Sequence, residues 1–133
     1  MRVFVDANVL FSAAWSPTGR IAAALANPLA LDAEWWTSDY AILETQTNLL
    51  RKRPAALSDL RQVLTHFNVI PWSAGEPCPV PELRDKDRPI LAAAISCQAR
   101  ILVTGDRRDF GPYFHQAKLT GGVCIVSPQE LFA

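Results

Sequence analysis

The sequence predicts an α/β protein, with a mostly parallel central sheet of about five strands covered by helices on both faces in a three-layer α/β/α arrangement. Two observations lead to this fold class. Short apolar segments typical of buried strands alternate with longer segments whose apolar residues recur at helical spacing. In addition, an acidic residue closely follows two of the apolar segments, in VFVD and in ILVTGD. Such proteins bind ligands at the carboxyl ends of their parallel strands.

The expected elements follow in chain order. Strands are expected at residues 2–6, 29–37, 68–72, 101–104 and 122–126. Helices are expected from about residue 7 to a break at 16–19, over 20–26 and 39–53, from 54 through 67, from 89 through 98, and after 127. A loop rich in proline and glycine is expected over 73–84, and a short segment at 110–118 precedes the last strand.

The helix expected over 39–53 follows Ser38, a good N-cap residue. Its buried stripe is expected at apolar pairs seven residues apart, Ile42 with Leu49 and Leu43 with Leu50. Glu44 lies beside this stripe, in line with Tyr40 and Asn48 at four-residue spacing. We therefore expect the Glu44 carboxylate to point over the edge of the sheet.

Composition limits the classes of function. The 133 residues predict one domain, over residues 1–133, large enough to bury a core. Thirteen basic and thirteen acidic residues cancel, so any nucleic-acid binding must come from a local basic patch. Three widely spaced cysteines are typical of reduced thiols in a cytoplasmic protein. No apolar run reaches the roughly 18–20 residues of a membrane span, and the N-terminus does not resemble a signal peptide.

Four carboxylates stand out at strand ends and helix starts: Asp6, Glu44, Asp87 and Asp106. Each has an ordinary structural explanation when taken alone. Asp6 and Asp87 could cap the helices that follow them, Glu44 could be a solvated helix residue, and Asp106 could serve the Thr-Gly-Asp turn. These explanations remain open for each acid separately.

Taken together, the four acids predict a metal site. Carboxylates a few ångströms apart repel one another by several kcal/mol, at an effective dielectric of about 20, unless a cation lies between them. An all-oxygen ligand set selects Mg²⁺ or Mn²⁺. The two histidines, His66 and His115, lie outside the acidic segments, so the sequence indicates no histidine-based site.

Four stretches, in the same order, resemble the PIN-domain family of metal-dependent nucleases: FVDANVLFSA, SDYAILETQTNLLR, DKDRPILAAAI and ILVTGDRRDF. The resemblance places Asp6, Glu44, Asp87 and Asp106 on the family's four acidic positions. It also matches Asp109 to a less constant acid that supports the metal, and Thr104 and Asn8 to supporting polar positions. The Asp85-Lys86-Asp87 run is one residue shorter than the usual family pattern, so Asp85 remains the second choice for the third acid.

This resemblance implies a PIN-like fold and hydrolysis of RNA phosphodiester bonds, leaving a 5′-phosphate and a 3′-hydroxyl. One or two Mg²⁺ or Mn²⁺ ions would assist the in-line attack of water. Asp6 and Asp106 would hold the principal ion, and Glu44 and Asp87 would complete its shell or orient the water. Many single PIN domains of this size resemble the toxins of toxin–antitoxin pairs (the VapC-like group). The implied partners are an RNA substrate, an antitoxin protein and a second copy of the chain. We expect the protein to act in the cytoplasm and not to bind a membrane.

Basic residues are expected around the acidic site, because RNA phosphates must lie beside it. Arg88 near Asp87, and one of Arg107 and Arg108 after Asp106, are the preferred candidates for RNA contact. Arg84, Lys86 and Arg51 are further candidates, whereas Lys52 and Arg53 are interpreted as ordinary surface charges. Of the adjacent tryptophans at 35 and 36, strand alternation should bury only one ring; the other could stack on a base or serve an interface.

Two other classes compete with the nuclease. A phosphoaspartyl domain, either a phosphatase or a receiver, also places acids and Mg²⁺ at strand ends. Asn8 stands where the phosphatase needs a second aspartate, and residues 122–127 lack the lysine of a receiver. A non-catalytic PIN-fold binding module would be expected to lose an acid, and all four are present.

Overall fold

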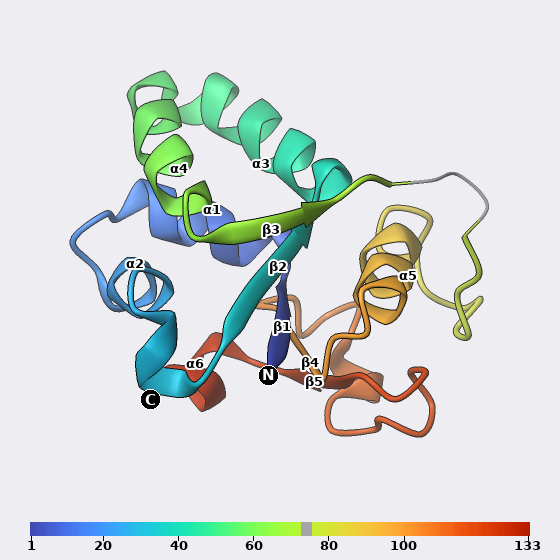
Figure 1. The fold of residues 1–133 in the computed structure, drawn as a ribbon. Coiled ribbons are helices and arrows are strands. Elements are labelled where there is room, and N and C mark those ends of the chain that lie inside the picture. Colours follow the sequence, from blue (N-terminus) through green and yellow to red (C-terminus); the bar gives the residue numbers. More distant parts are fainter. Residues whose placement is uncertain (73–75) are drawn as a thin grey trace.

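The computed structural model describes residues 1–72 and 76–133 and contains one five-stranded sheet in the order β3-β2-β1-β4-β5. Every neighbouring pair is parallel, which confirms the expected sheet (Figure 1). The strands are β1 (Arg2–Val5), β2 (Glu34–Ser38), β3 (Phe67–Ile70), β4 (Ile101–Val103) and β5 (Cys124–Val126). The α-helices are α1 (Ala7–Trp15), α2 (Arg20–Leu25), α3 (Asp39–Lys52), α4 (Leu57–Leu64), α5 (Arg88–Ser96) and α6 (Pro128–Leu131). Within the described residues, no helix combines the length and apolar character needed to cross a membrane.

The sheet separates two apolar clusters. On one face α1, α2 and α4 pack around Trp35 and Leu10, and on the other α5 packs around Phe4 and Phe110. In β1, Val3 and Val5 belong to the first cluster and Phe4 to the second, which explains why this strand is apolar throughout. Helices therefore cover both faces of the sheet, and the expected three-layer α/β/α arrangement is confirmed (Figure 1).

The order of the strands creates one crossover point at the centre of the sheet. From β1 the chain proceeds through β2 to β3 on one side, and then returns to form β4 and β5 on the other side of β1. The carboxyl ends of β1 and β4 lie side by side, with Val5 opposite Val103. Open parallel sheets form their ligand sites at such a point, because the chain leaves the two strands in opposite directions.

Two expected elements are wrong in part. The strand expected at 29–37 starts only at Glu34, because Pro28–Leu31 form a 3-10 helix (η1) and Asp32 has a left-handed backbone with φ of 51°. The helix expected from 54 through 67 is divided into a 3-10 turn (η2, Pro54–Ala56) and α4, and Phe67 already belongs to β3. The loop expected at 73–84 contains neither helix nor strand over residues 76–84, while 73–75 lie outside the described residues.

The stripe expected on α3 is also partly wrong. Leu49 is buried, but Leu43 and Leu50 are 63% and 62% exposed. The buried face is formed instead by Ala41, Thr45 and Leu49. Small side chains allow α3 to lie close to α1, and the Thr45 hydroxyl hydrogen-bonds the carbonyl oxygens of Ala41 at 2.8 Å and of Ala7 at 3.3 Å. The packing of α3 on α1 therefore determines which face is buried.

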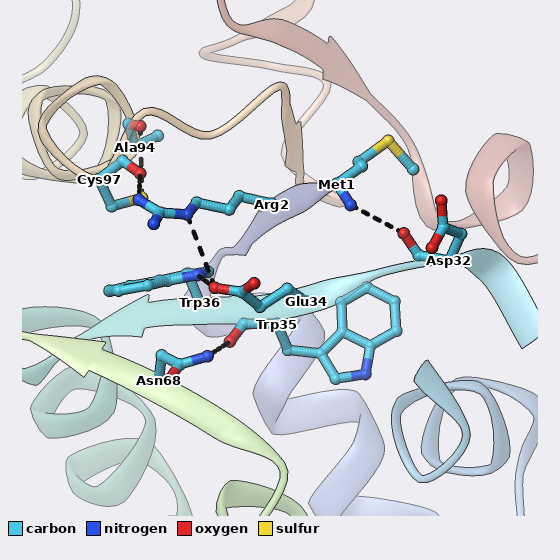
Figure 2. Close-up of polar contacts among 9 residues, drawn as sticks. All are labelled: Met1, Arg2, Asp32, Glu34, Trp35, Trp36, Asn68, Ala94 and Cys97. Carbon is cyan, nitrogen blue, oxygen red and sulfur yellow. Dashed lines mark hydrogen bonds and ion pairs between the residues drawn. The ribbon is translucent and has the colours of Figure 1, made fainter. Parts of the chain in front are cut away.

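The amino end of the sheet is held by polar contacts around Arg2 (Figure 2). Its guanidinium donates to the carbonyl of Cys97 at 2.8 Å, pairs with Glu34 at 3.6 Å and lies 4.9 Å from the centre of the Trp36 ring. The Trp36 indole also donates to Glu34, at 2.7 Å. Trp35 is buried and Trp36 only partly so, which confirms that alternation buries one ring of the pair. These contacts hold the partly buried Trp36 ring against Arg2 and Glu34.

Candidate metal centre

Asp6 occupies the junction between β1 and α1. Its Oδ1 accepts a hydrogen bond from the N–H of Ala7 at 2.6 Å, and its backbone is extended. Asp6 therefore caps α1, which confirms the helix-cap explanation for this residue. Its Oδ2 accepts from the hydroxyl of Thr104 at 2.8 Å and from the amide of Asn8 at 3.3 Å. One buried carboxylate thus both starts a helix and presents an oxygen at the carboxyl edge of the sheet.

Asn8 and Thr104 join the ends of β1 and β4. The Asn8 amide donates to the Thr104 hydroxyl at 3.2 Å, and its carbonyl oxygen accepts from the N–H of Gly105 at 2.8 Å. The N–H of Asp106 in turn donates to the Thr104 hydroxyl at 3.1 Å. A Cβ atom on Gly105 would lie 3.3 Å from the Asn8 side-chain oxygen, so glycine permits this close approach. The network fixes the two strand-end acids relative to each other.

Asp106 lies beside two further acids. One carboxylate oxygen from each of Asp87, Asp106 and Asp109 lies within 4.8 Å of the others. The N–H of Asp109 donates to Asp106 at 3.0 Å, so the turn explanation of Asp106 also holds. Asp109 forms an ion pair with Arg84 at 3.4 Å, which partly neutralises this acid. The cluster therefore keeps an excess of negative charge.

Asp87 precedes α5, yet its side chain makes no capping hydrogen bond, and the cap explanation for this residue is wrong. The residue is only 6% exposed, and its Oδ2 has no hydrogen-bond partner within residues 1–72 and 76–133. Leaving a buried charged oxygen unpaired is costly. Asp85, the second choice for this position, is exposed and pairs with Arg88. The structure therefore places Asp87, and not Asp85, among the acids.

All four predicted acids face one cavity of about 280 Å³ at the carboxyl edge of the sheet. Its wall is formed by Asp6, Ala7, Asn8, Phe11, Glu44, Asn48, Lys52, Lys86, Asp87 and Asp106. Glu44 and Asn48 reach it from successive turns of α3, as their four-residue spacing predicted. Asp109 does not line the cavity, but its N–H hydrogen-bonds the carboxylate of Asp106, which does.

The electrostatics of the site follow from burial and repulsion. Desolvation raises the pKa of Asp6 to about 6, with smaller contributions from Glu44 and Asp106 and an opposing one from the Thr104 hydrogen bond. Desolvation, followed by repulsion from Asp106, raises the pKa of Asp87 to about 7. Burial and the negative charge of Glu44 also raise the pKa of Tyr40. Bringing these acids together is therefore unfavourable while they are ionised.

The donor set fits a hard divalent cation. It consists of carboxylate oxygens, and Asp87, whose Oδ2 is unpaired among the described residues, lies close to Asp106. Magnesium and manganese favour such oxygen ligands. Asp87 and Asp106 would hold the ion, and Asp6 and Glu44 face the same cavity and could complete its shell. A bound cation would also relieve the repulsion that adds to desolvation in raising both pKa values.

The basic residues divide into two groups. Lys52 and Lys86 line the acidic cavity. Arg88 instead holds its own loop, donating to the carbonyls of Pro81 and Leu83, and Arg107 pairs with Glu130 at 3.9 Å. Arg108 is exposed.

Sequence reasoning missed Phe11 as a residue of the site and interpreted Lys52 as surface charge. A usable signal was present for Lys52, because Glu44, Asn48 and Lys52 recur every four residues along α3. No comparable signal marks Phe11, because it follows Val9 and Leu10 in an apolar run of α1 and has the pattern of a core residue.

The chain is similar to a known protein family in sequence and to a solved structure in fold. Curated protein sequences provide no match. Among solved structures, a chain of the crystal structure of VapBC2 from Rickettsia felis bound to a DNA fragment from their promoter superposes with a TM-score of 0.69 at 18% identity. The match covers 96% of this chain and 98% of that chain, and at this identity it shows the fold alone. The model of the PIN domain family matches residues 2–108. The chain therefore belongs to the PIN domain family.

Proposed function

We propose that this protein is a hydrolase of RNA, a Mg²⁺- or Mn²⁺-dependent endoribonuclease that cuts phosphodiester bonds in the acidic cavity. The observation that carries the proposal is the buried Oδ2 of Asp87, which has no hydrogen-bond partner among the described residues. Asp87 lies beside Asp106 and lines a cavity that Asp6 and Glu44 also line. Membership of the PIN domain family supports the same activity.

The roles proposed for the residues follow from their positions. Asp6, Glu44, Asp87 and Asp106 hold one or two ions, with Asp109 as an outer support. Thr104 and Asn8 orient the Asp6 carboxylate through their hydrogen bonds to Oδ2. Lys52 and Lys86, at the cavity wall, are placed to contact the RNA phosphates. When bound, a divalent cation would acidify the attacking water and stabilise charge on the phosphoryl oxygens.

The proposed setting is a toxin–antitoxin pair. The solved structure with a similar fold contains VapBC2 bound to a promoter DNA fragment, which supports an antitoxin partner for this chain. We propose that the protein acts in the cytoplasm, as a homodimer, until such a partner silences it. We also propose that residues 1–133 form a single PIN domain, because β5 and α6 beyond the family match complete the same sheet and core.

The activity can be tested by incubating the purified chain with single-stranded RNA in Mn²⁺ or Mg²⁺, in EDTA, and with the Asp106→Asn variant. We expect cleavage that needs the metal and falls at least a hundredfold in the variant, since loss of a metal ligand and its charge removes several kcal/mol. Asp32→Asn, an exposed change far from the cavity, is the matched control and should cleave normally. Cleavage that persists in EDTA or in Asp106→Asn would refute the mechanism. Metal binding without cleavage would favour the non-catalytic binding module.

A further inference from the structure

Two helices lead outward from the acidic cavity and carry aromatic and cationic side chains with them. Phe11 on α1 and Lys52 at the end of α3 line the cavity, and the Lys52 ammonium lies 5.6 Å from the centre of the Phe11 ring. One helical turn further out, Trp15 stacks on Phe11 with 5.5 Å between ring centres and 23° between planes. The Arg53 guanidinium lies 5.1 Å from the Trp15 ring centre. We call these four residues the aromatic track.

The track is held in place by both helices. The guanidinium of Arg53 also donates to the backbone carbonyl of Trp15 at 2.8 Å, which fixes it beside the ring. Phe11 and Trp15 are four residues apart on α1, so their rings lie one above the other along the helix. The result is a preformed row of two rings and two cations that begins at the cavity wall.

The composition of the track matches one ligand in particular. Trp15 is 39% exposed although its large ring would gain from burial. Aromatic faces combined with cations along a surface are the means by which proteins bind single-stranded nucleic acid, because bases stack on the rings and cations neutralise the phosphates. Bases within a duplex are already stacked on one another and are not available to such a surface.

We propose that the aromatic track binds single-stranded RNA next to the bond to be cut, with a base stacked at Trp15 and backbone phosphates held by Lys52 and Arg53. This inference rests on the proposed function, since it takes the acidic cavity as the place of cleavage. It adds the course of the strand, which leaves the cavity past Phe11 and Lys52 and continues over the end of α1. It also restricts the substrate to unpaired RNA over this stretch.

The positions of Lys52 and Arg53 suit electrostatic contact with an RNA strand beside the acidic cavity. Four carboxylates in the cavity repel the phosphates of an approaching strand, and Lys52 reduces that repulsion at the point where the strand would leave. Arg53 supplies a second charge beside Trp15, and its planar guanidinium can itself stack on a base. The competing explanation is a purely structural contact that fastens the end of α3 to α1. That explanation predicts lost stability without lost RNA affinity.

Binding can be measured without cleavage. The probe is a fluorescein-labelled single-stranded RNA of about twelve nucleotides, titrated with the whole chain in EDTA and followed by fluorescence anisotropy. Because no metal is needed, this result is independent of whether the chain cleaves RNA. We expect Trp15→Ala to weaken binding about tenfold and Trp15→Tyr, which keeps an aromatic face, to restore most of the affinity. Melting temperatures of both variants show whether each remains folded.

The matched control is Trp72→Ala. Trp72 is 41% exposed and packs on Tyr40, with 5.3 Å between ring centres, so it offers a comparable aromatic surface elsewhere. We expect this variant to bind the probe within about twofold of the parent chain. An equal or larger loss in Trp72→Ala, or a folded Trp15→Ala that binds normally, would overturn the proposal.

A second probe separates stacking from charge. An abasic strand of the same length keeps the phosphates but offers no base, so Trp15→Ala should no longer weaken binding to it. Arg53→Gln should weaken binding to both strands and reduce the dependence of log K on log salt by about 0.7, because the variant neutralises one phosphate fewer. Equal affinity of the parent chain for single-stranded and duplex RNA would also contradict the proposal. Cleavage without this binding pattern would leave the nuclease intact and refute the track alone.

Discussion

Replacing Asp6 by asparagine should stabilise the metal-free protein at about pH 8 while it weakens the metal site. Burial raises the pKa of Asp6 from 3.8 to about 6. Each pH unit between the folded and unfolded pKa values corresponds to about 1.4 kcal/mol, so the ionised carboxylate costs about 3 kcal/mol. Asparagine removes this cost and can still accept from the Ala7 N–H. Its amide nitrogen cannot accept at the second position, where Oδ2 receives the Thr104 hydroxyl and the Asn8 amide, a loss of about 2 kcal/mol.

The expected net gain is therefore about 1 kcal/mol in the free energy of unfolding at pH 8. Whether Asp6→Asn raises or lowers the free energy of unfolding depends on pH. A carboxyl whose folded pKa is raised contributes stability that is fully present below its unfolded pKa, and loses it as the pH rises through the folded value. Near pH 4 the Asp6 carboxyl is largely protonated in the folded state, so the gain from asparagine should fall to about zero or below.

The assay is urea unfolding in EDTA at several pH values between 4 and 8, on the parent chain, Asp6→Asn and the exposed control Asp32→Asn. We expect the control to change stability by less than about 0.5 kcal/mol at every pH. A destabilisation by Asp6→Asn of the same size at pH 4 and pH 8 would refute the reasoning. It would mean that the hydrogen bonds to Asp6 outweigh the cost of burying its charge.

Three other outcomes follow from the same geometry. Mg²⁺ at about a hundred times its dissociation constant should stabilise the parent chain by about 2.7 kcal/mol in urea unfolding, and Asp106→Asn should lose most of that gain; an unchanged response would exclude Asp106 as a ligand. Thr104→Val should destabilise the protein by about 1–3 kcal/mol at pH 8 in the same assay, because it removes the buried donor to Asp6, whereas an unchanged midpoint would mean that water replaces the hydroxyl. Arg88→Met should weaken Mn²⁺ binding about tenfold in calorimetric titration, because the guanidinium holds two carbonyls of the segment before Asp87; undiminished affinity would show that this segment keeps its shape without Arg88.

Features encoded by neighbouring residues could be predicted from the sequence. The caps at Asp6 and Ser38 were recognisable because a cap acts on the backbone within three residues. The placement of Glu44 over the cavity followed from helical spacing alone. The placement of Asp6 and Asp106 at the same edge of the sheet was also predictable. The alternation of strands and helices indicates a parallel sheet, whose strands all end at one edge.

Features set by tertiary contacts could not be predicted. Leu43 and Leu50 are exposed because the small Ala41 and Thr45 face α1, which the spacing of leucines does not reveal. The hydrogen bond between Asp6 and Thr104 joins residues 98 positions apart. Likewise, the missing cap at Asp87 depends on the backbone before α5 and not on its residue type.

The most direct test of the account is anomalous diffraction from crystals of this chain soaked in Mn²⁺. We predict a peak in the acidic cavity, about 2.0–2.6 Å from carboxylate oxygens of Asp87 and Asp106, with Asp6 or Glu44 in or next to the coordination shell. A peak at that position would also provide a partner for the Asp87 Oδ2, which has none within residues 1–72 and 76–133. A cavity that stays empty at saturating Mn²⁺, or a peak held by other residues, would contradict the central claim.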